Sequence, residues 1–355
     1  MRLNQFDYFR AIAILIIVAG HCIYDVIKVD TFFEKVLVNL IYGGTAFFVF
    51  ISGFFFHHVF YKKFNYQAFM LKKVQNVVCP YIIITTIAMV LYLFTHPYLN
   101  NWTAKEVAQA SVSVYQTIVL YFEYLLFGGI SAQFWYMPFI IIIFLMSPIF
   151  IGFIKLPRHL QWLTFSILFF NSILIWRPET HLSPWHHVLY YTPIYLLGII
   201  CSIYRERFLS MIEGKAWLFG LSALTLAVIQ VAFFGVVGHF EKSQPFTFTG
   251  FDIMLIQEVL IGMSILAILQ RYENKEISLL KILAAASFAI YFLHEFVKLV
   301  IKGVFVRLNI WDNFSRMPES VAWLFLVAVI TLLSLASAWL VKKSFKTRSK
   351  YLVGW

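Results

Sequence analysis

The segment YFRAIAILIIVAGHCIYDVI, residues 8–27, decides the fold class of this chain. Almost every position in it is apolar, and a helix that crosses a bilayer needs about 20 mostly apolar residues. The segment has no A-x-A cleavage site, and Arg10 precedes its apolar run. We therefore interpret it as an uncleaved membrane span rather than as a secretory signal.

The composition of the whole chain agrees with a membrane protein. Of its 355 residues, 61% are hydrophobic and 13% are charged, and the mean hydropathy is +0.80. A soluble domain is nearer to about half apolar and a quarter charged, so lipid must be the solvent for much of the surface. The 39 Phe, 19 Tyr and 10 Trp agree with this, because aromatic side chains fill helix bundles and anchor at membrane interfaces.

Ten segments have the length and apolar character of membrane spans, which predicts an all-α, polytopic membrane helix bundle with about ten transmembrane helices. A further stretch, 107–128, contains Gln109 and Glu123, and we expect it to form an interfacial or re-entrant helix. No repeat or linker divides the chain, so we expect one membrane domain over 1–345 and a short basic tail over 346–355. The ten predicted spans are 8–27, 36–56, 77–95, 134–153, 161–176, 187–204, 216–236, 252–270, 279–300 and 320–341.

The basic residues between the spans predict the orientation of the bundle. With the N-terminus in the cytoplasm, eighteen Lys and Arg residues fall on that side and eight, among them Arg177, on the other. This asymmetry fits the positive-inside rule with both termini cytoplasmic and an even number of spans. We therefore expect a multi-pass protein of a bacterial inner membrane, surrounded by membrane lipids.

Nucleic acid and metal ions are not expected partners. The net charge of +11 comes from basic residues in short loops between apolar runs, and there is no basic domain. Cys22, Cys79 and Cys201 lie in or beside apolar segments, and their number and spacing form neither a disulfide framework nor a metal-binding pattern. We expect no metal cofactor and interpret the cysteines as packing residues.

The ionisable residues of the first span are its most informative feature, because such groups are costly inside a membrane and are usually functional. The 11 positions from Arg10 to His21 amount to about 20° more than three helical turns, so both side chains lie on one face, about 16 Å apart. A histidine at this depth suits a general base, since its ordinary pKa of about 6.5 is near working pH. Asp25, one turn further, is placed to orient the imidazole. The alternative is that Arg10 extends to the headgroups and His21 only packs.

Five motifs occur in a characteristic order along the chain. They are FDYFRAIAI over 6–14 followed by His21, GGTAFFVFISGF over 43–54, the basic cluster LKK over 71–73 before Pro80 and Tyr81, FWYMP over 134–138, and ASFAIYFLH over 286–294. In this order they resemble the motifs of the acyltransferase-3 family of membrane O-acyltransferases, including its S-x-x-x-Y-x-x-H pattern in the ninth span. The resemblance covers essentially the whole chain.

The resemblance implies an acyl-CoA donor on the cytoplasmic side, with acetyl-CoA as the default co-substrate and succinyl-CoA as an alternative. The acceptor is then a hydroxyl group of a cell-surface glycan or a lipid-linked sugar. By the same resemblance, His21 is the catalytic histidine and Arg10 its partner. The family often has two basic residues three apart before its third span; here Lys73 matches the first, but Asn76 stands at the second. Lys72 is therefore a further candidate for contact with the donor phosphates, the alternative being that these lysines only set the topology.

Polar residues of the ninth span are candidates for substrate binding. Ser287, Tyr291 and His294 recur on one helical face, at offsets of four and three residues. With Glu295 they are expected to form a hydrogen-bond network near the substrate. A purely structural polar network is the alternative.

Two aromatic residues of the FWYMP motif are further candidates. Trp135 and Tyr136 have rings that can stack on a sugar or on a nucleotide base. Anchoring at the membrane interface is the alternative, since Trp and Tyr are enriched there.

The sequence therefore indicates a membrane O-acyltransferase that acts on a sugar hydroxyl. Direct attack of the hydroxyl with His21 as base, and an acyl-histidine intermediate, both fit the pattern. A transporter or flippase for a polysaccharide intermediate is the alternative from another class, because ten spans and buried charges suit it as well. Dependence on acyl-CoA separates the two.

Overall fold

The computed structural model describes residues 3–95, 114–178, 183–238, 250–310, 314 and 316–355. Within these ranges the chain forms helices and turns and contains no β-strand, which confirms the predicted all-α class. The α-helices are α1 (Asn4–Val26), α2 (Phe32–Ile41), α3 (Gly44–Phe55), α4 (Tyr66–Lys73), α5 (Cys79–Thr95), α7 (Val114–Phe127), α8 (Tyr136–Leu145), α9 (Ser147–Ile154), α10 (Arg158–Ile175), α11 (Pro184–Ile203), α12 (Arg205–Ile212), α13 (Ala216–Phe234), α14 (Ile253–Leu269), α15 (Ser278–Arg307), α17 (Glu319–Phe345) and α18 (Ser349–Val353). Shorter 3-10 and π-helical segments are η1 (Phe56–Phe60), η2 (Tyr61–Lys63), η3 (Val74–Val78), η4 (Gln270–Tyr272) and η5 (Lys346–Arg348).

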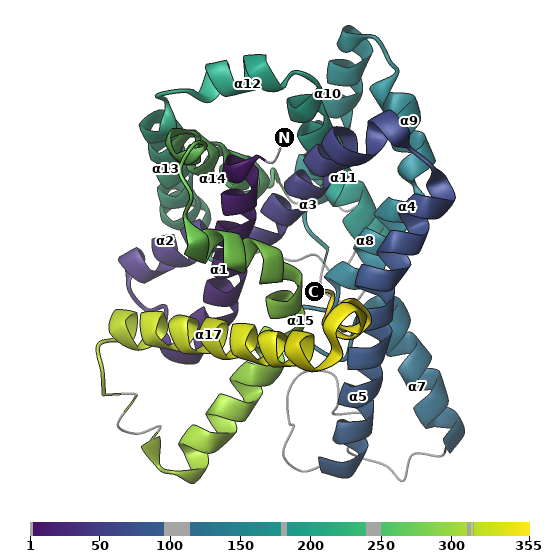
Figure 1. Cartoon of the computed structure of the whole chain (residues 1–355). Coiled ribbons are helices and arrows are strands. Elements are labelled where there is room, and N and C mark those ends of the chain that lie inside the picture. The colour runs from purple at the N-terminus through teal and green to yellow at the C-terminus, as the bar shows by residue number, and fades with distance from the viewer. Residues whose placement is uncertain (1–2, 96–113, 179–182, 239–249, 311–313, 315) are drawn as a thin grey trace.

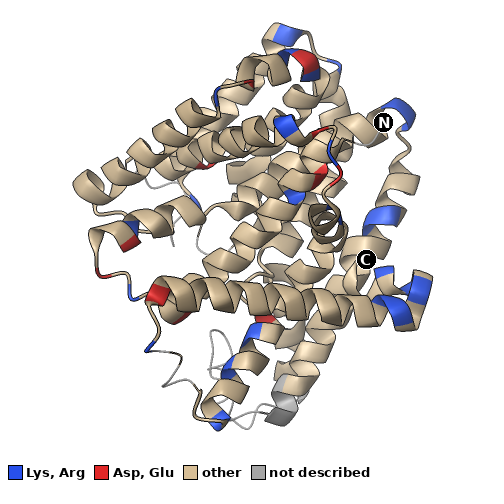
Figure 2. Ribbon diagram, turned by 60° about the vertical axis from the view of Figure 1, so that its left-hand side comes forward, with Lys and Arg blue, Asp and Glu red and all other residues tan. Residues whose placement is uncertain are grey.

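The polytopic membrane bundle is confirmed. Eight helical segments of the described chain are long and apolar enough to cross a membrane, and the pair α8 and α9, bent by 56°, raises the number to nine. Figure 2 shows long stretches of helix without charged residues, with most charged residues near helix ends and in loops. Helix α10 covers the predicted span 161–176 but is not among the nine; Arg158, His159 and Gln161 make its first turn polar.

Helix α1 is the central element of the bundle and packs against α3, α14, α15 and α17 (Figure 1). The Tyr8 hydroxyl donates a hydrogen bond to the carbonyl oxygen of Lys275, just before α15 begins, at 2.5 Å. Near the other end of α1, Asp25 lies 2.7 Å from the ammonium group of Lys302. Since the start of α1 meets the start of α15, and the end of α1 meets the last third of α15, the two helices run parallel.

Helices α3 and α11 cross with almost no space between their backbones. Gly53 faces the carbonyl group of Tyr195, and Gly198 faces that of Phe50. A Cβ atom at either glycine would overlap backbone atoms of the other helix. Small residues permit such close approach in membranes, where helix association depends on packing. The small-residue motif over 43–54 therefore joins α3 to α11.

The chain between α7 and α8 interrupts the helical structure inside the bundle. Residues 128–135 form a turn that begins at Gly128, whose φ of +75° favours glycine. The carbonyl oxygen of Gln133 in this turn accepts a hydrogen bond from the Tyr291 hydroxyl of α15. Irregular backbone at membrane depth is tolerated where protein covers it, and α15 provides that cover.

Helix α7 corresponds to the second part of the predicted re-entrant stretch. It has 14 residues and is not among the candidate spans. Residues 107–113, with Gln109, lie outside the described residues. The part that is described therefore has the short length expected of a re-entrant helix.

Both ends of the described chain reach the same cavity. Leu3, before α1, and Gly354, after α18, each contribute to its lining. The basic tail folds into α18, whose Ser349 and Val353 are buried. The two ends of the described chain therefore meet at one cavity.

Candidate active site

The imidazole of His21 lies in a cluster of ionisable side chains between α1 and α15. Its Nδ1 atom is 3.2 Å from Oε1 of Glu295, and its ring centroid is 5.1 Å from that of His294. On its other side, Glu295 Oε1 is 2.9 Å from the ammonium group of Lys298. The side chain of Glu295 is 9% exposed and that of His21 is 28% exposed, so the imidazole is the accessible member of this pair.

The contact with Glu295 determines which imidazole nitrogen is available for chemistry. A carboxylate beside Nδ1 favours the tautomer in which Nδ1 carries the proton. Nε2 then keeps its lone pair and can accept a proton from a hydroxyl group, as in hydrolases that pair a histidine with a carboxylate. His21 therefore has the environment of a general base.

Asp25 does not have the expected position beside the imidazole. Its Oδ1 atom lies 2.7 Å from the ammonium group of Lys302, and its Oδ2 atom lies 3.5 Å from that of Lys298. The prediction that Asp25 orients the ring is corrected, because the carboxylate that contacts His21 comes from α15. Asp25 is linked to His21 only through Lys298. The ammonium group of Lys298 also contacts Glu295 and donates a hydrogen bond to the carbonyl oxygen of His21 at 2.7 Å.

The three α15 residues expected on one helical face lie along a line from the cluster toward the cavity. His294 is buried beside His21, and its Nδ1 atom is 2.8 Å from the carbonyl oxygen of Tyr291. Tyr291 is also buried, and its ring centroid is 6.1 Å from that of His294. Ser287 lies two turns before His294 and lines the cavity described next.

A cavity of about 570 Å³ lies where the two ends of the described chain meet. Arg10, Lys72 and Lys73, the three basic residues expected to bind the donor, all line it. The guanidinium group of Arg10 lies 4.9 Å from the ring centroid of Phe55, and the ammonium group of Lys73 lies 4.2 Å from that of Phe144. The structure therefore brings the cations of α1 and α4 together in what we call the basic cavity.

Two π-helical segments, η1 and η3, border the basic cavity. Such segments are rare and occur frequently at functional sites. Phe56, Val59 and Phe60 of η1 line the cavity, as do Asn76 and Val77 of η3. Asn76 is the residue that replaces the second basic position of the family pattern, so this chain presents an amide there.

Helices α1 and α15 lead from the basic cavity to the imidazole cluster. Arg10 and Ser287 line the cavity, whereas His21 and His294 meet 11 and 7 residues further along their helices. At 1.5 Å per residue these separations are about 16 Å and 10 Å. The imidazole of His21 therefore lies about 16 Å further along α1 than the residue of that helix that lines the cavity.

Trp135 and Tyr136 are both buried, so neither anchors the protein at the membrane interface. Tyr136 lines the basic cavity, where it can contact a ligand. The Trp135 ring stacks on His187 with a centroid distance of 4.4 Å, and the guanidinium group of Arg177 lies 4.9 Å from its centroid. Of the two candidates, Tyr136 therefore faces the basic cavity, whereas Trp135 packs against His187 and Arg177.

The cluster also has residue types that bind metal ions. His21, His294 and Glu295 each place one possible ligand atom within 4.8 Å of the others. However, the ammonium group of Lys298 lies 2.9 Å from Glu295, and it would repel a cation bound there. The charge of Lys298 therefore disfavours a metal ion at this cluster.

Lys298 is the member of the cluster that sequence reasoning missed. It lies inside the predicted span 279–300, and an ionisable residue at that depth is a signal of function. The sequence predicts Glu295 only in a network with His294, not beside His21. Since 277 positions separate Lys298 from His21, no local pattern could pair the two helices.

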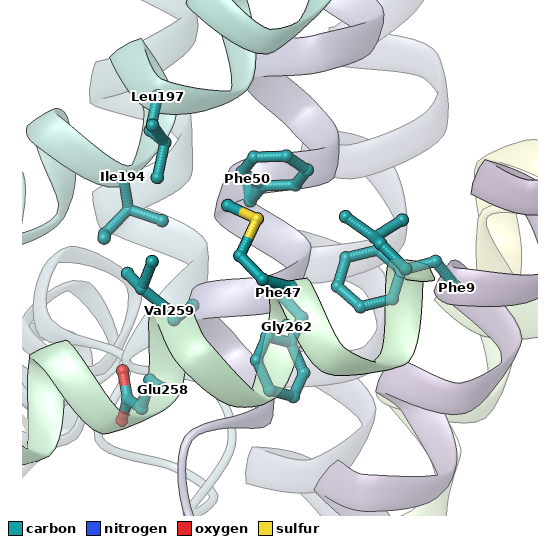
Figure 3. Close-up of a pocket in the computed structure, with 11 residues that line it drawn as sticks. Phe9, Phe47, Phe50, Ile194, Leu197, Glu258, Val259 and Gly262 are labelled. Atoms are coloured by element: carbon teal, nitrogen blue, oxygen red, sulfur yellow. The ribbon is translucent and has the colours of Figure 1, made fainter. Parts of the chain in front are cut away.

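A second cavity, where α1, α3, α11 and α14 meet, is too small for a substrate (Figure 3). Its volume of about 20 Å³ has room for one water molecule. The lining is apolar except for Glu258, whose side chain lies so close to Gly43 that a Cβ atom there would overlap it. We assign this cavity to packing.

Comparison with known proteins agrees with this geometry. A family model described as an acyltransferase domain matches residues 3–342, which include the imidazole cluster and nearly all of the basic cavity. Searches of the curated proteins and of the solved structures found no match. Because the family model covers nearly the whole chain, this membrane protein belongs to the acyltransferase-3 family and is a membrane acyltransferase.

Proposed function

We propose that this protein is an O-acyltransferase that moves an acyl group, by default acetyl, from cytoplasmic acetyl-CoA to a hydroxyl group of a cell-surface glycan or a lipid-linked sugar. The observation that carries the proposal is the placement of the basic cavity and the His21–Glu295 pair along the parallel helices α1 and α15. A polyanionic donor and a general base are then within reach of each other. The class of acceptor rests on the resemblance of the motifs.

In the proposed complex, the phosphate groups of the donor contact Arg10, Lys72 and Lys73. Arg and Lys bind phosphate oxygens through charge-assisted hydrogen bonds, which are about twice as strong as neutral ones. Asn76 adds a neutral hydrogen-bond donor to the same cavity. The pantetheine arm extends along α1 for about 16 Å and brings the thioester toward His21.

His21 acts on the acceptor in this proposal. Its Nε2 atom removes the proton of the hydroxyl group as the hydroxyl oxygen attacks the carbonyl carbon of the thioester. The new C–O bond forms, the C–S bond breaks, and the proton passes from the imidazole to the thiolate, which leaves as CoA thiol. Glu295 stabilises the protonated ring through Nδ1, while Lys298 holds the carboxylate in place. In an acyl-histidine route, the same Nε2 atom would carry the acyl group.

The proposed location is a bacterial inner membrane, with the basic cavity and both termini facing the cytoplasm. Acyl-CoA is made in the cytoplasm, and the excess of basic loop residues lies on the side of the N-terminus. Leu3 and Gly354 both line the cavity that would receive the donor. The donor site and the chain termini therefore share one face.

The proposal is tested by acyl transfer with purified protein, radiolabelled acetyl-CoA and a panel of p-nitrophenyl glycosides. We expect the wild type to label a glycoside and His21→Ala to lose transfer about 10²–10⁴-fold while it still binds CoA. His159→Ala, an exposed histidine at the start of α10, is the matched control and should keep full activity. Full activity of His21→Ala would exclude its role as the base. Movement of a polysaccharide intermediate across vesicles without acyl-CoA would instead support the transporter.

A further inference from the structure

A third cavity, of about 350 Å³, lies between α10, α13 and α14. Trp176 and Arg177 line it from the segment after α10, Gln230 from the end of α13, and Asp252 from the start of α14. All four side chains are buried. They include an aromatic ring, a cation, an amide and a carboxylate, and none of them contributes to the basic cavity.

This third cavity lies at the depth of His21. The Gln5 amide near the start of α1 donates a hydrogen bond to the carbonyl oxygen of Leu266 near the end of α14, at 2.8 Å. One turn later on α1, Phe9 lies beside Gly262, one turn earlier on α14, so the two helices run antiparallel from that contact. Asp252 comes 14 residues before Leu266, and His21 comes 16 residues after Gln5. These separations amount to about 21 Å and 24 Å in the same direction. The cavity is therefore far from the donor end of the bundle.

One close contact links the lining of the cavity to α1. Val236 lines the cavity, and two residues later Gly238 lies so close to the Tyr24 hydroxyl that an added Cβ atom would be 2.9 Å from it. Tyr24 follows His21 by three residues. The cavity therefore lies near the end of α1 that carries the imidazole cluster.

The Trp176 ring is held in a defined orientation at the cavity. Its indole Nε1 donates a hydrogen bond to the carbonyl oxygen of Gly250 at 2.7 Å. The backbone of Trp176 has a φ of +61°, a conformation that is rare for a bulky residue. Such backbone outliers cluster at ligand-binding and active sites, where the surrounding structure maintains them. The surrounding structure therefore holds the Trp176 ring at the cavity although its backbone conformation is unfavourable.

The polar groups of the cavity are also fixed. The Gln230 amide nitrogen donates to Gln257 at 2.6 Å, and no residue of the described chain donates a hydrogen bond to the Gln230 Oε1 atom. Asp252 accepts a hydrogen bond from the Tyr190 hydroxyl at 2.7 Å and caps α14 through the backbone N–H of Met254. The carboxylate and the amide therefore cannot turn away from a ligand.

We propose that this third cavity binds the sugar of the acceptor. An aromatic ring beside fixed hydrogen-bonding groups recognises a sugar, because the apolar face of the sugar ring stacks and its hydroxyl groups bond to the polar side chains. Trp176 provides the stacking surface, and Gln230, Asp252 and Arg177 bind the hydroxyl groups. The inference rests on the proposed acyltransferase function and adds the place of the acceptor. Donor and acceptor then approach His21 from opposite faces of the membrane.

The test separates acceptor kinetics from donor kinetics in the full-length protein. Trp176→Ala and Gln230→Ala are compared with Trp162→Ala, a matched tryptophan on α10 outside the cavity, using p-nitrophenyl glycosides and acetyl-CoA. We expect the acceptor KM to rise at least about tenfold in both cavity variants, while the KM for acetyl-CoA stays unchanged. Trp176→Phe keeps a ring and should recover part of the acceptor affinity. Unchanged acceptor KM values alongside normal wild-type transfer would overturn the site and leave the proposed function standing.

A direct measurement of sugar binding tests the site even if no acyl transfer is detected. Saturation-transfer NMR with the same glycosides is carried out without a donor on the wild type and on each variant. Binding that depends on Trp176 in a protein that transfers nothing would support the cavity and contradict the proposed function. No binding by the wild type, either of free glycosides or of the same sugars on a polyprenyl phosphate, would overturn the inference. Stronger binding of the polyprenyl form would identify a lipid-linked acceptor.

Discussion

Oε1 of Glu295 lies 3.2 Å from Nδ1 of His21, although 274 positions of sequence separate the two residues. The same oxygen is 2.9 Å from the ammonium group of Lys298, so the carboxylate is held between an imidazole and a cation. A carboxylate in this position orients a histidine for proton transfer and stabilises the ring once it is protonated. The activity of His21 should therefore depend on α15 as much as on its own helix.

Replacing Glu295 with glutamine tests this dependence. We expect Glu295→Gln to lower kcat about 10²–10⁴-fold, because an amide can present its N–H group to Nδ1 and select the wrong tautomer. The KM for acetyl-CoA should not change, since the basic cavity is untouched. Acyl transfer per unit of folded protein is the measurement. Glu123→Gln, an exposed glutamate on α7, should behave as wild type. A wild-type kcat for Glu295→Gln would show that the pair does not orient the base.

Replacing Asp25 should lower kcat moderately, whereas replacing Lys298 should mainly lower the stability of the fold. Asp25→Asn is expected to lower kcat roughly tenfold, since it acts on Glu295 only through Lys298. Lys298→Met should unfold more readily, by about 3–5 kcal/mol, because it leaves the buried carboxylate of Glu295 without its cation, whereas Asp25 keeps Lys302. Thermal unfolding in detergent and kcat are measured on the same samples. If Asp25→Asn loses more activity than Glu295→Gln, Asp25 is the residue that orients the imidazole.

The basic cavity predicts how CoA affinity depends on single cations. Arg10→Ala and Lys73→Ala should each raise the Kd for CoA about 10- to 100-fold, the effect of losing one hydrogen bond to a charged group. Binding should weaken with salt, and less steeply in the variants. Calorimetry with CoA and with 3′-dephospho-CoA would show which cation contacts the 3′-phosphate. Lys215→Ala, an exposed lysine before α13, is the control. Unchanged CoA binding by the Arg10→Ala/Lys73→Ala double variant would rule out this donor site.

The close crossing of α3 and α11 predicts that one added methyl group at Gly53 strongly destabilises the protein. Gly53→Ala places a Cβ atom against the carbonyl group of Tyr195 and should cost about 1–3 kcal/mol of stability or more, because overpacking forces the helices apart. Gly152→Ala is the matched control, since an added Cβ atom there has no neighbour within 4 Å. The melting temperatures of both variants in the same detergent are compared. Equal stability of the two would mean that the helices do not cross as closely as described.

The shared location of the termini predicts the topology. Leu3 and Gly354 line one cavity, so a reporter at either end should report the same compartment. We expect a reporter that works only in the periplasm to be inactive after Trp355 and active when inserted in the loop 28–31 between α1 and α2. Activity after Trp355 would refute a cytoplasmic C-terminus.

Relationships within one helix could be predicted from the sequence. The period of an α-helix placed Arg10 and His21 on one face, and the structure finds Arg10 in the basic cavity and His21 in the cluster. The same reasoning aligned Ser287 with His294 on α15. In each case the geometry depends on 3.6 residues per turn and on nothing outside the helix.

Relationships between helices could not be predicted in this way. The carboxylate nearest to His21 in the sequence is Asp25, whereas packing brings Glu295 to the ring and leaves Asp25 with two lysines. Apolar spans resemble one another, so one sequence does not reveal which pairs meet. Arg177 is a similar case, because counting loop charges treats it as solvent-facing, but it is 7% exposed and packs over Trp135.

The parallel pairing of α1 with α15 has a consequence for how the protein is made. Asp25 enters the membrane early in synthesis, and its partner Lys302 is translated 277 residues later. At about 5–20 residues per second this delay is roughly 15–55 s. A nascent chain that stalls before α15 holds an aspartate and a histidine in the membrane without counter-ions, which is costly and exposes it to quality-control proteases. Such a fragment also lacks Glu295, so under the proposed mechanism its histidine is not yet oriented to act as a base.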